Sequence, residues 1–165
     1  MTVRLEDPEA RLQHARDVAW KALNRRERTV AELARLLAAK RVEPAAIETV
    51  LAELLEQGYL DDASYAQRFA DDRRRLDAWG AERIERKLLS LGIDRELIAA
   101  AVGEQDHAGE IEAALELLAR RFPDPPQTPR DRDRALGMLV RKGYELELAY
   151  DALRRHCGAR AESFE

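Results

Sequence analysis

A repeat of 51 residues restricts the fold of this chain more than any other feature. Val42, Ile93 and Tyr144 hold the same place in three segments that align without a gap, each 51 residues after the one before. An acidic residue follows each of them, at Glu43, Asp94 and Glu145. Similar Leu- and Ala-rich helices can match by chance, but the constant spacing and the recurring acid favour a true repeat. A fixed period of this size indicates an array of similar structural units.

Each unit is predicted to contain three helices. Apolar residues recur at helical spacing, as at Ile111, Leu115 and Leu118. Leu and Ala make up most of the apolar residues, and with Arg and Glu they favour helix, while β-branched and aromatic residues are sparse. We expect the first helices at residues 9–26, 62–78 and 108–122, the second helices to begin near Thr29, Gly80 and Arg130, and the third helices to follow the acids at 43, 94 and 145.

The predicted fold is all-α, a tandem array of three three-helix repeats forming an elongated, curved molecule. The helices give repeat limits of 9–61, 62–105 and 106–158. The stretch "PDPPQTPRD" after Phe122 has four prolines in seven residues and cannot continue a helix. We therefore expect a connector at 123–129 inside the third repeat, and a frayed tail at 158–165.

Local signals mark the starts of several helices. Thr29 and Glu32 form the pattern of a capping box, in which each side chain accepts a hydrogen bond from the other residue's amide. The acid before each third helix can accept from free amides and faces the positive end of the helix dipole. Pro44 suits a first helical turn, because its missing N–H costs nothing there.

Composition excludes several classes of protein. A single cysteine, Cys157, rules out an internal disulfide and a cysteine zinc cluster, and it suits a reducing compartment. No stretch approaches the ~20 apolar residues of a membrane span, and the first residues lack the apolar run of a signal peptide. We expect a cytoplasmic protein without membrane contact. The net charge of -4 argues mildly against a stand-alone nucleic-acid binder, although local patches can override it.

The stretch "EQGYLDDASYAQRFADDRRR", from 56 to 75, contains a pair of carboxylates that needs an explanation. A metal or acid–base site would need further ligands beside Asp61 and Asp62. A joint between two helices explains the pair better. Gly58 can close one helix in the left-handed conformation, and Tyr59 and Leu60 can then pack into the core. Either aspartate can cap the helix that follows.

No other catalytic or metal-binding pattern is present in the sequence. His14, His107 and His156 lack partners at metal-binding spacing. Cys157 follows His156, but neighbours on a helix point in different directions and chelate poorly. The chain has no Gly-rich phosphate loop, serine nucleophile elbow or Cys-x-x-Cys. We therefore expect no enzyme activity, no catalytic residue, no metal site and no cofactor.

Residues 29–60 resemble the helix-turn-helix portion of a winged-helix DNA-binding regulator. The second helix of such a motif enters the major groove. Here that helix would be "PAAIETVLAELLEQ", which contains Glu48, Glu53 and Glu56 and no Lys or Arg. DNA phosphates would repel it. No wing follows, because Gly58 leads through the aspartates into another helix, so this interpretation stays only an alternative.

Basic residues gather in the second and third repeats. Arg83, Arg86 and Lys87 have the spacing of residues that share one helix face. Eight basic and five acidic residues lie between Arg130 and Arg160. Such residues can be ordinary solvated faces, or a basic surface for an acidic protein, a phosphate backbone or both. The candidate contact residues are Arg74, Arg75, Arg83, Arg86, Lys87, Arg132, Arg134, Arg141, Lys142, Arg154 and Arg155.

Two segments, "LAELLEQGYLDDASYAQRFADDRRR" and "WGAERIERKLLSLGIDRELIAAAV", resemble the bacterial RecX family of recombination regulators. The family's hallmark is a Gly, an aromatic or apolar pair, one or two acids and an aromatic–Ala step. The matching residues are Gly58, Tyr59, Leu60, Asp61, Asp62, Tyr65, Ala66 and Phe69, and the later pattern matches Arg73, Gly80, Ile84, Leu88, Gly92 and Ile93. The resemblance runs from about residue 10 to 157 and is weakest in the third repeat. We assign these hallmark residues mainly to the fold, and expect Arg73 to be partly covered.

The chain departs from the family pattern in places. Lys87 stands where the family often has an acid, and Leu91 where a basic residue is common. Arg41 stands where the later repeats have Gly92 and Gly143. A residue other than glycine is unfavourable in a left-handed turn, so we expect the turn at Arg41 to differ.

The resemblance implies a non-enzymatic protein that binds RecA and restrains its assembly on single-stranded DNA, strand exchange and the linked ATP hydrolysis. Such a protein acts in DNA recombination and repair and in the SOS response. It would lie along the groove of the RecA–DNA filament as a monomer, with weak direct DNA contact as a further option. The alternatives are a winged-helix-like DNA-binding regulator and a generic helical adaptor for another partner.

Overall fold

The computed structural model describes residues 7–158 of the 165-residue chain. Within this range there are nine α-helices and no strand, as predicted, and no helix is long and apolar enough to cross a membrane. The helices are α1 (Pro8–Leu23), α2 (Val30–Ala39), α3 (Pro44–Glu56), α4 (Asp62–Asp77), α5 (Ala81–Ser90), α6 (Arg95–Val102), α7 (His107–Arg121), α8 (Pro129–Lys142) and α9 (Leu146–Gly158).

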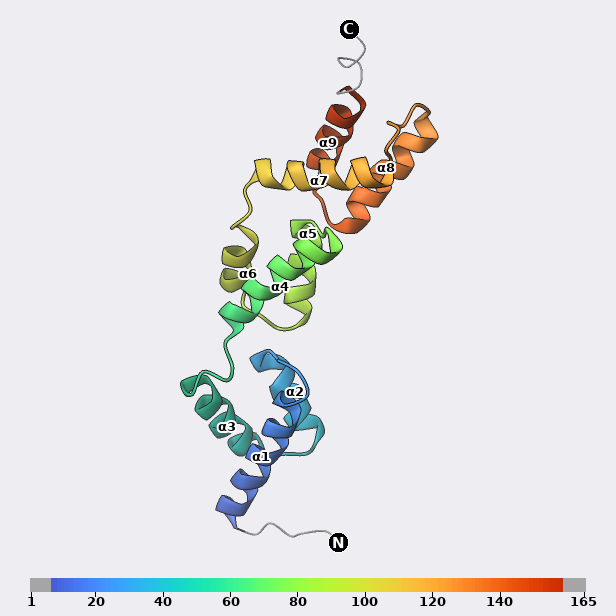
Figure 1. Cartoon of the computed structure of the whole chain (residues 1–165). Coiled ribbons are helices and arrows are strands. Elements are labelled where there is room, and N and C mark those ends of the chain that lie inside the picture. Colours follow the sequence, from blue (N-terminus) through green and yellow to red (C-terminus); the bar gives the residue numbers. More distant parts are fainter. Residues whose placement is uncertain (1–6, 159–165) are drawn as a thin grey trace.

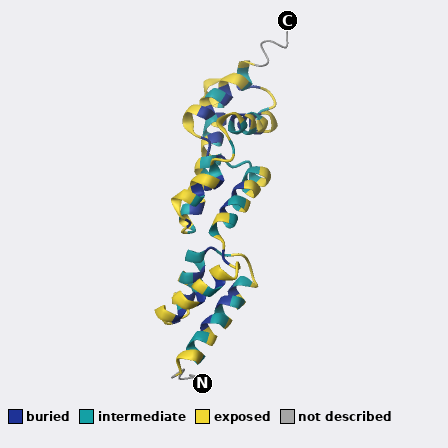
Figure 2. Ribbon diagram, turned by 90° about the vertical axis from the view of Figure 1, so that its left-hand side faces the viewer, coloured by how far each residue is buried: buried dark blue, intermediate teal, exposed yellow. Residues whose placement is uncertain are grey.

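The helices pack in three groups of three, and each group has its own apolar core. We call α1–α3 repeat 1, α4–α6 repeat 2 and α7–α9 repeat 3. Leu37, Leu88 and Leu139, at the same place in successive repeats, are all fully buried. The groups follow one another end to end in an elongated, gently curved molecule, with α1 at one end and α9 towards the other (Figure 1). Figure 2 shows the buried residues facing inward within each group.

The predicted helix starts are mostly confirmed. Thr29 and Glu32 form the capping box, with the Glu32 amide donating to Thr29 Oγ1 over 3.1 Å and the Thr29 amide donating to Glu32 Oε2 over 3.0 Å. Asp94 accepts from the Glu96 amide over 2.9 Å. The prediction for Glu43 is wrong, because its side chain accepts no hydrogen bond from a helix amide. Instead, the Glu43 carboxylate accepts a hydrogen bond from the Arg11 guanidinium on α1 over 3.0 Å.

The turn before α3 does not differ from its counterparts, contrary to our expectation. Arg41 has a φ of 60°, in the same left-handed region as Gly92 at 78° and Gly143 at 96°. The following residue, Val42, is buried, and its amide donates to the Leu37 carbonyl over 3.1 Å. Packing of this turn therefore overrides the backbone preference of the arginine.

The proline-rich connector of repeat 3 is non-helical, as predicted, and it packs against its own repeat. Pro125 and Pro126 are buried. His156 on α9 contacts the Phe122 carbonyl over 2.8 Å, so the connector is attached at its start. Helix α8 begins after it with a proline in the first turn. The tail predicted at 158–165 lies outside the described residues, apart from the last residue of α9.

Candidate partner-binding surface

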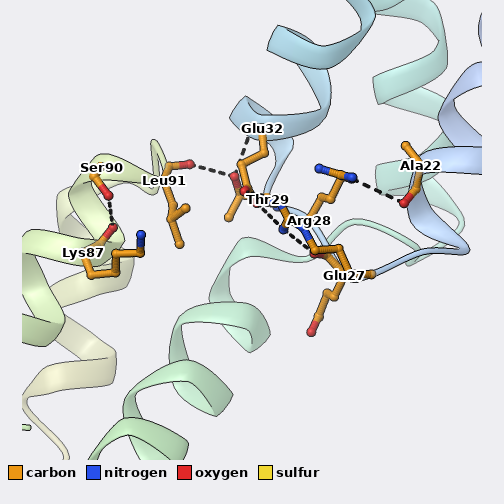
Figure 3. Close-up of polar contacts among 9 residues, drawn as sticks. Ala22, Glu27, Arg28, Thr29, Glu32, Lys87, Ser90 and Leu91 are labelled. Carbon is orange, nitrogen blue, oxygen red and sulfur yellow. Dashed lines mark hydrogen bonds and ion pairs between the residues drawn. The ribbon is translucent and has the colours of Figure 1, made fainter.

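Repeats 1 and 2 are joined at the start of α2. Thr29 is the one polar or charged residue that is buried within 7–158. Its hydroxyl donates to the Leu91 carbonyl over 2.7 Å, which satisfies both groups (Figure 3). The Val30 amide donates to Asp62 Oδ1 over 3.0 Å. The first residue of α4 therefore caps a helix of the repeat before it.

Repeats 2 and 3 are joined in the same way, 51 residues further along. The Gly80 amide donates to the Lys142 carbonyl over 2.8 Å, and these two residues are the equivalents of Thr29 and Leu91. The Ala81 amide, the equivalent of that of Val30, donates to Glu110 Oε1 over 2.7 Å. At both joints, an acid from the first helix of one repeat caps the second helix of the preceding repeat.

At both joints, the turn after the second helix of the later repeat requires a glycine, because this turn packs against the preceding repeat. A Cβ at Gly92 would lie 2.4 Å from the Cβ of Ala31, and a Cβ at Gly143 would lie 2.3 Å from that of Arg83. The close approach places the C-terminal end of α8 at the start of α5, and the C-terminal end of α5 at the start of α2. Opposite ends of the helix dipoles meet at each joint. The second helices thus form a continuous spine along the array.

The hallmark stretch between α3 and α4 is a helix joint, as we interpreted it. Gly58 has a φ of 78°, and Leu60 is 2% exposed. Asp61 caps α4 by accepting from the Ser64 amide over 3.0 Å, and this amide, with the Ser64 hydroxyl, lowers the pKa of the Asp61 carboxyl. Burial raises the pKa of the Asp62 carboxyl. The cap by Asp61 was predicted, while the bond from Asp62 to repeat 1 was not.

Tyr59 is the exception in this stretch. We expected its ring in the core, but the residue is 55% exposed. The ring contacts Trp20 edge-on, with a centroid distance of 4.5 Å. Leu60 already fills the space over repeat 1, so its neighbour in the chain points outward.

Arg73 is partly covered, as predicted. Its guanidinium lies 5.5 Å from the ring centroid of Phe69 and 5.7 Å from that of Trp79. It also pairs with Asp77 one turn later on α4. Tyr65 stacks near Phe69, and both pack against the core of repeat 2, where Ala66 is fully buried. These hallmark residues thus all have structural contacts.

Three of the candidate contact residues bind main-chain carbonyls at the ends of helices, and a fourth, the exposed Arg132, donates to the Pro126 carbonyl of the connector over 3.5 Å. Arg74 donates to the Val102 carbonyl at the end of α6 over 2.6 Å, and Lys142 donates to the Asp77 carbonyl at the end of α4 over 2.8 Å. Arg83 donates to the Arg141 carbonyl over 3.2 Å, and its guanidinium lies 4.1 Å from the ring centroid of Trp79. Cations are favourable at helix C-termini, so these three side chains stabilise the array.

The remaining candidates are exposed, and they are Arg75, Arg86, Lys87, Arg132, Arg134, Arg141, Arg154 and Arg155. Arg75 pairs with Asp72, and both Arg154 and Arg155 pair with Asp151, in solvent-exposed ion pairs that contribute little to stability. The side chains of Arg86 and Lys87 form no hydrogen bond or ion pair with a described residue. Of the three residues expected to share a face on α5, these two remain free for a partner.

The described residues contain no group of three or more His, Cys, Asp and Glu side chains that could hold a metal ion. The sites that the sequence analysis missed are the contacts between repeats, made by Thr29, Asp62 and Glu110. The 51-residue register signals the contacts between turns and helix starts, because it places two equivalent helix starts opposite two equivalent turns, but it does not signal the two acids, which are 48 residues apart (110 - 62 = 48).

Comparison with known proteins decides the family. Residues 15–54 match the model of the first three-helix domain of RecX, and residues 61–102 match that of the second. The regulatory protein RecX of Leptothrix cholodnii is 36% identical over 136 residues, which covers 82% of this chain and 85% of that protein. The chain belongs to the RecX family. It is therefore a member of a family of regulatory proteins.

Two further RecX proteins agree with this assignment. Regulatory protein RecX of Streptomyces coelicolor is 30% identical over 162 residues and matches 97% of this chain and 86% of its own length. The crystal structure of RecX from Lactobacillus salivarius superposes with a TM-score of 0.78 at 18% identity, covering 90% of this chain and 97% of that one. This superposition covers more of the chain than the two family-model matches, which together lie within residues 15–102.

Proposed function

We propose that this RecX protein is a non-enzymatic regulator that binds RecA, or the RecA filament on single-stranded DNA, and inhibits its recombinase and ATPase activities. The observation that carries the proposal is the spine of second helices, which presents exposed cations on two successive repeats. Arg86 and Lys87 lie on α5, and Arg134 and Arg141 lie on α8. A filament presents the same surface again and again, so a partner with fixed spacing can meet several subunits at once.

Multiple weak contacts explain how so small a chain can act on a large filament. When one repeat is bound, the next is held at a high effective concentration near its own contact. The gain exists only if the geometry allows both contacts together. Hydrogen bonds to main-chain groups at both joints hold the repeats in one arrangement, so a second contact would not require the repeats to be ordered first.

The proposed action takes place in the cytoplasm, and the active form is a monomer. Arg86 and Lys87 are our first candidates for contact, because they are exposed and have no partner among the described residues. Arg74, Arg83 and Lys142 are weaker candidates, because their charged groups already bind main-chain carbonyls.

Binding to RecA filaments tests the proposal. The chain, labelled with a fluorophore at Cys157, is titrated with filaments assembled on single-stranded DNA with a non-hydrolysable ATP analogue. We expect tight binding that Arg86→Glu/Lys87→Glu weakens by about tenfold or more. The matched control is Lys21→Glu/Arg25→Glu, which changes the charge equally at exposed positions of repeat 1 and should leave binding within about twofold of wild type.

Absence of binding by the folded wild-type chain would sink the proposal and leave the adaptor function. The winged-helix alternative has no support in the structure, because α3 carries no Lys or Arg and its Glu53 pairs with Arg16 over 2.8 Å. Tight binding to bare duplex DNA with sequence preference would revive it.

A further inference from the structure

A hollow of about 570 Å³ lies between the end of α7 and the outer face of α8. Four arginines line it, namely Arg121, Arg130, Arg134 and Arg141, with the ring of Phe122 beside them. One acid, Asp133, also lines the hollow. We call this feature the arginine hollow. Four cations facing one carboxylate give it an excess of positive charge in a chain whose net charge is -4.

The helical register of α8 builds the arginine hollow. Arg130, Arg134, Gly137 and Arg141 are separated by four, three and four residues, so they form one stripe along the helix. Gly137 leaves room in the middle of the stripe. A Cβ there would lie 3.1 Å from Nη1 of Arg141, so the glycine allows the Arg141 guanidinium to lie along the helix surface.

The charges in the hollow are available to a ligand. Arg134 has one ion pair, to Asp131 on the neighbouring turn, at 3.6 Å and with the Arg134 side chain 69% exposed. The guanidiniums of Arg121, Arg130 and Arg141 form no hydrogen bond or ion pair within the described part of the chain. Clefts lined by one sign of charge concentrate the electrostatic potential and attract ligands of the opposite charge.

The positive charge continues from the hollow onto repeat 2. The carbonyl of Arg141 accepts a hydrogen bond from the Arg83 guanidinium over 3.2 Å. Arg83 is the first of three basic residues on one face of α5, and the other two, Arg86 and Lys87, are exposed. The spine thus has a row of cations from the start of α8, across the joint, to α5, which suits an extended polyanion better than a single small anion.

We propose that the arginine hollow binds the phosphodiester backbone of single-stranded nucleic acid. Guanidinium groups match phosphate oxygens in a bidentate geometry, and all four cations in the hollow are arginines. Phe122 lines the edge of the hollow and is half-buried, because it also packs against the core of repeat 3, and the part that stays exposed can contact an unpaired base. A charged groove combined with an aromatic side chain is the usual arrangement for binding single strands, whose bases are free to stack.

This inference deepens the proposed function and rests on it, because it gives the chain its own contact with the single strand inside the filament. It also divides the basic residues of repeat 3 into two sets. Arg130 and Arg134 line the arginine hollow, whereas Arg132 and Arg154 line a separate, more apolar hollow between α8 and α9 with Leu136. Only the first set is assigned to the single strand, although the two sets are close in sequence.

Binding of a labelled oligo(dT) to the full chain, without RecA, tests the inference by fluorescence anisotropy over a range of salt concentrations. We expect Arg130→Glu/Arg134→Glu to weaken binding by about tenfold or more. The plot of log K against log salt should become less steep by about 1.4, because two phosphate contacts are lost and each contributes about 0.7 to the steepness for a single strand. The matched control, Arg132→Glu/Arg154→Glu, makes the same charge change outside the hollow and should stay within about twofold.

Three results would overturn the inference. The first is a wild-type chain that does not bind oligo(dT). The second is an equal loss of affinity for oligo(dT) in both double variants. The third is an Arg130→Glu/Arg134→Glu chain that binds oligo(dT) normally but loses RecA in the absence of DNA, which would assign the hollow to an acidic protein surface. In each case the filament-binding assay on wild type still reports on the proposed function. Far-ultraviolet circular dichroism confirms that each variant is folded.

Discussion

At the scale of single residues, three equivalent turns show what packing can impose on the backbone. Gly92 and Gly143 occupy left-handed turns where a joint leaves no space for a side chain. Arg41 has the same backbone conformation in repeat 1, and within residues 7–158 no other repeat forms a joint with its turn. The arginine is therefore sterically possible there, but its backbone conformation remains unfavourable.

Arg41→Gly should stabilise the chain by about 0.5–1 kcal/mol. Relief of a left-handed conformation gains about 1–2 kcal/mol, and the greater freedom of glycine in the unfolded state offsets part of this. Urea denaturation measures the change. Arg41→Ala is the control, because it removes the side chain but keeps Cβ, and it should not be more stable than wild type. A stabilisation by alanine as large as that by glycine would contradict the explanation.

Tyr144 makes the stability of the chain depend on alkaline pH. Burial raises the pKa of the Tyr144 phenol to about 12, and its hydroxyl donates to the Ala78 carbonyl over 3.1 Å across the second joint. In the unfolded chain the pKa is about 10. The native state therefore keeps the proton longer, and its contribution is full below pH ~10 and is lost as the pH rises through the folded pKa.

Tyr144→Phe should cost about 1 kcal/mol at pH 8, because the hydrogen bond to Ala78 is lost. The difference in free energy of unfolding between wild type and variant should narrow between pH ~10 and 12, since phenylalanine does not titrate. Denaturation curves at several pH values measure it. A constant difference across that range would show that the phenol is not protected by burial.

At the scale of elements, the two joints explain why the repeat length is held at 51 residues. At each joint, the turn after the second helix of one repeat contacts the start of the second helix of the preceding repeat. An acid on the first helix of the later repeat must reach the same helix start. A change in length between these points would separate the carbonyl from its donor. For the turns, the register of the sequence is thus also the register of the hydrogen bonds, since the Leu91 and Lys142 carbonyls each accept from a residue 62 positions earlier, whereas the acids are not in this register.

Gly92→Ala should destabilise the chain by at least ~2 kcal/mol, because it combines left-handed strain with overpacking against Ala31. Gly58→Ala is the matched control. Gly58 has the same φ of 78°, but a Cβ there would meet nothing within 4 Å, so the loss should be about 1 kcal/mol. A second substitution, Ala31→Gly, should recover part of the stability lost in Gly92→Ala, but none of the stability lost in Gly58→Ala. Equal losses at both glycines would mean that the joint does not determine stability.

The helices and the core were predictable from the sequence because apolar periodicity and capping patterns act over a few residues. Leu37, Leu88 and Leu139 needed only their spacing to be placed in the core. The joints depend on main-chain groups, which carry no residue type to recognise, so the bond from Asp62 to repeat 1 was missed. For the same reason, Arg74 could not be told from the free cations until its carbonyl partner was seen.

At the scale of the whole molecule, the spine of second helices connects three repeats, each with a small apolar core, into one elongated structure. The buried residues of each core come from a single repeat, and the repeats meet through directed hydrogen bonds and, at the second joint, through Ala78 at the end of α4, which packs against the core of repeat 3. The exposed cations of repeats 2 and 3 lie along this body, while α3 of repeat 1 carries none. Shape and charge together fit a regulator that lies along a polymer of repeated subunits.

The most direct measurement is ATP hydrolysis by the cognate RecA on single-stranded DNA as this chain is added. We predict inhibition well below one chain per RecA, because in the proposed function each chain engages several subunits. Reversal of Arg86 and Lys87 to Glu should raise the amount of chain needed, and the Lys21→Glu/Arg25→Glu control should not. Unchanged hydrolysis at a stoichiometric excess of folded, helical chain would contradict the proposal that this RecX protein regulates RecA.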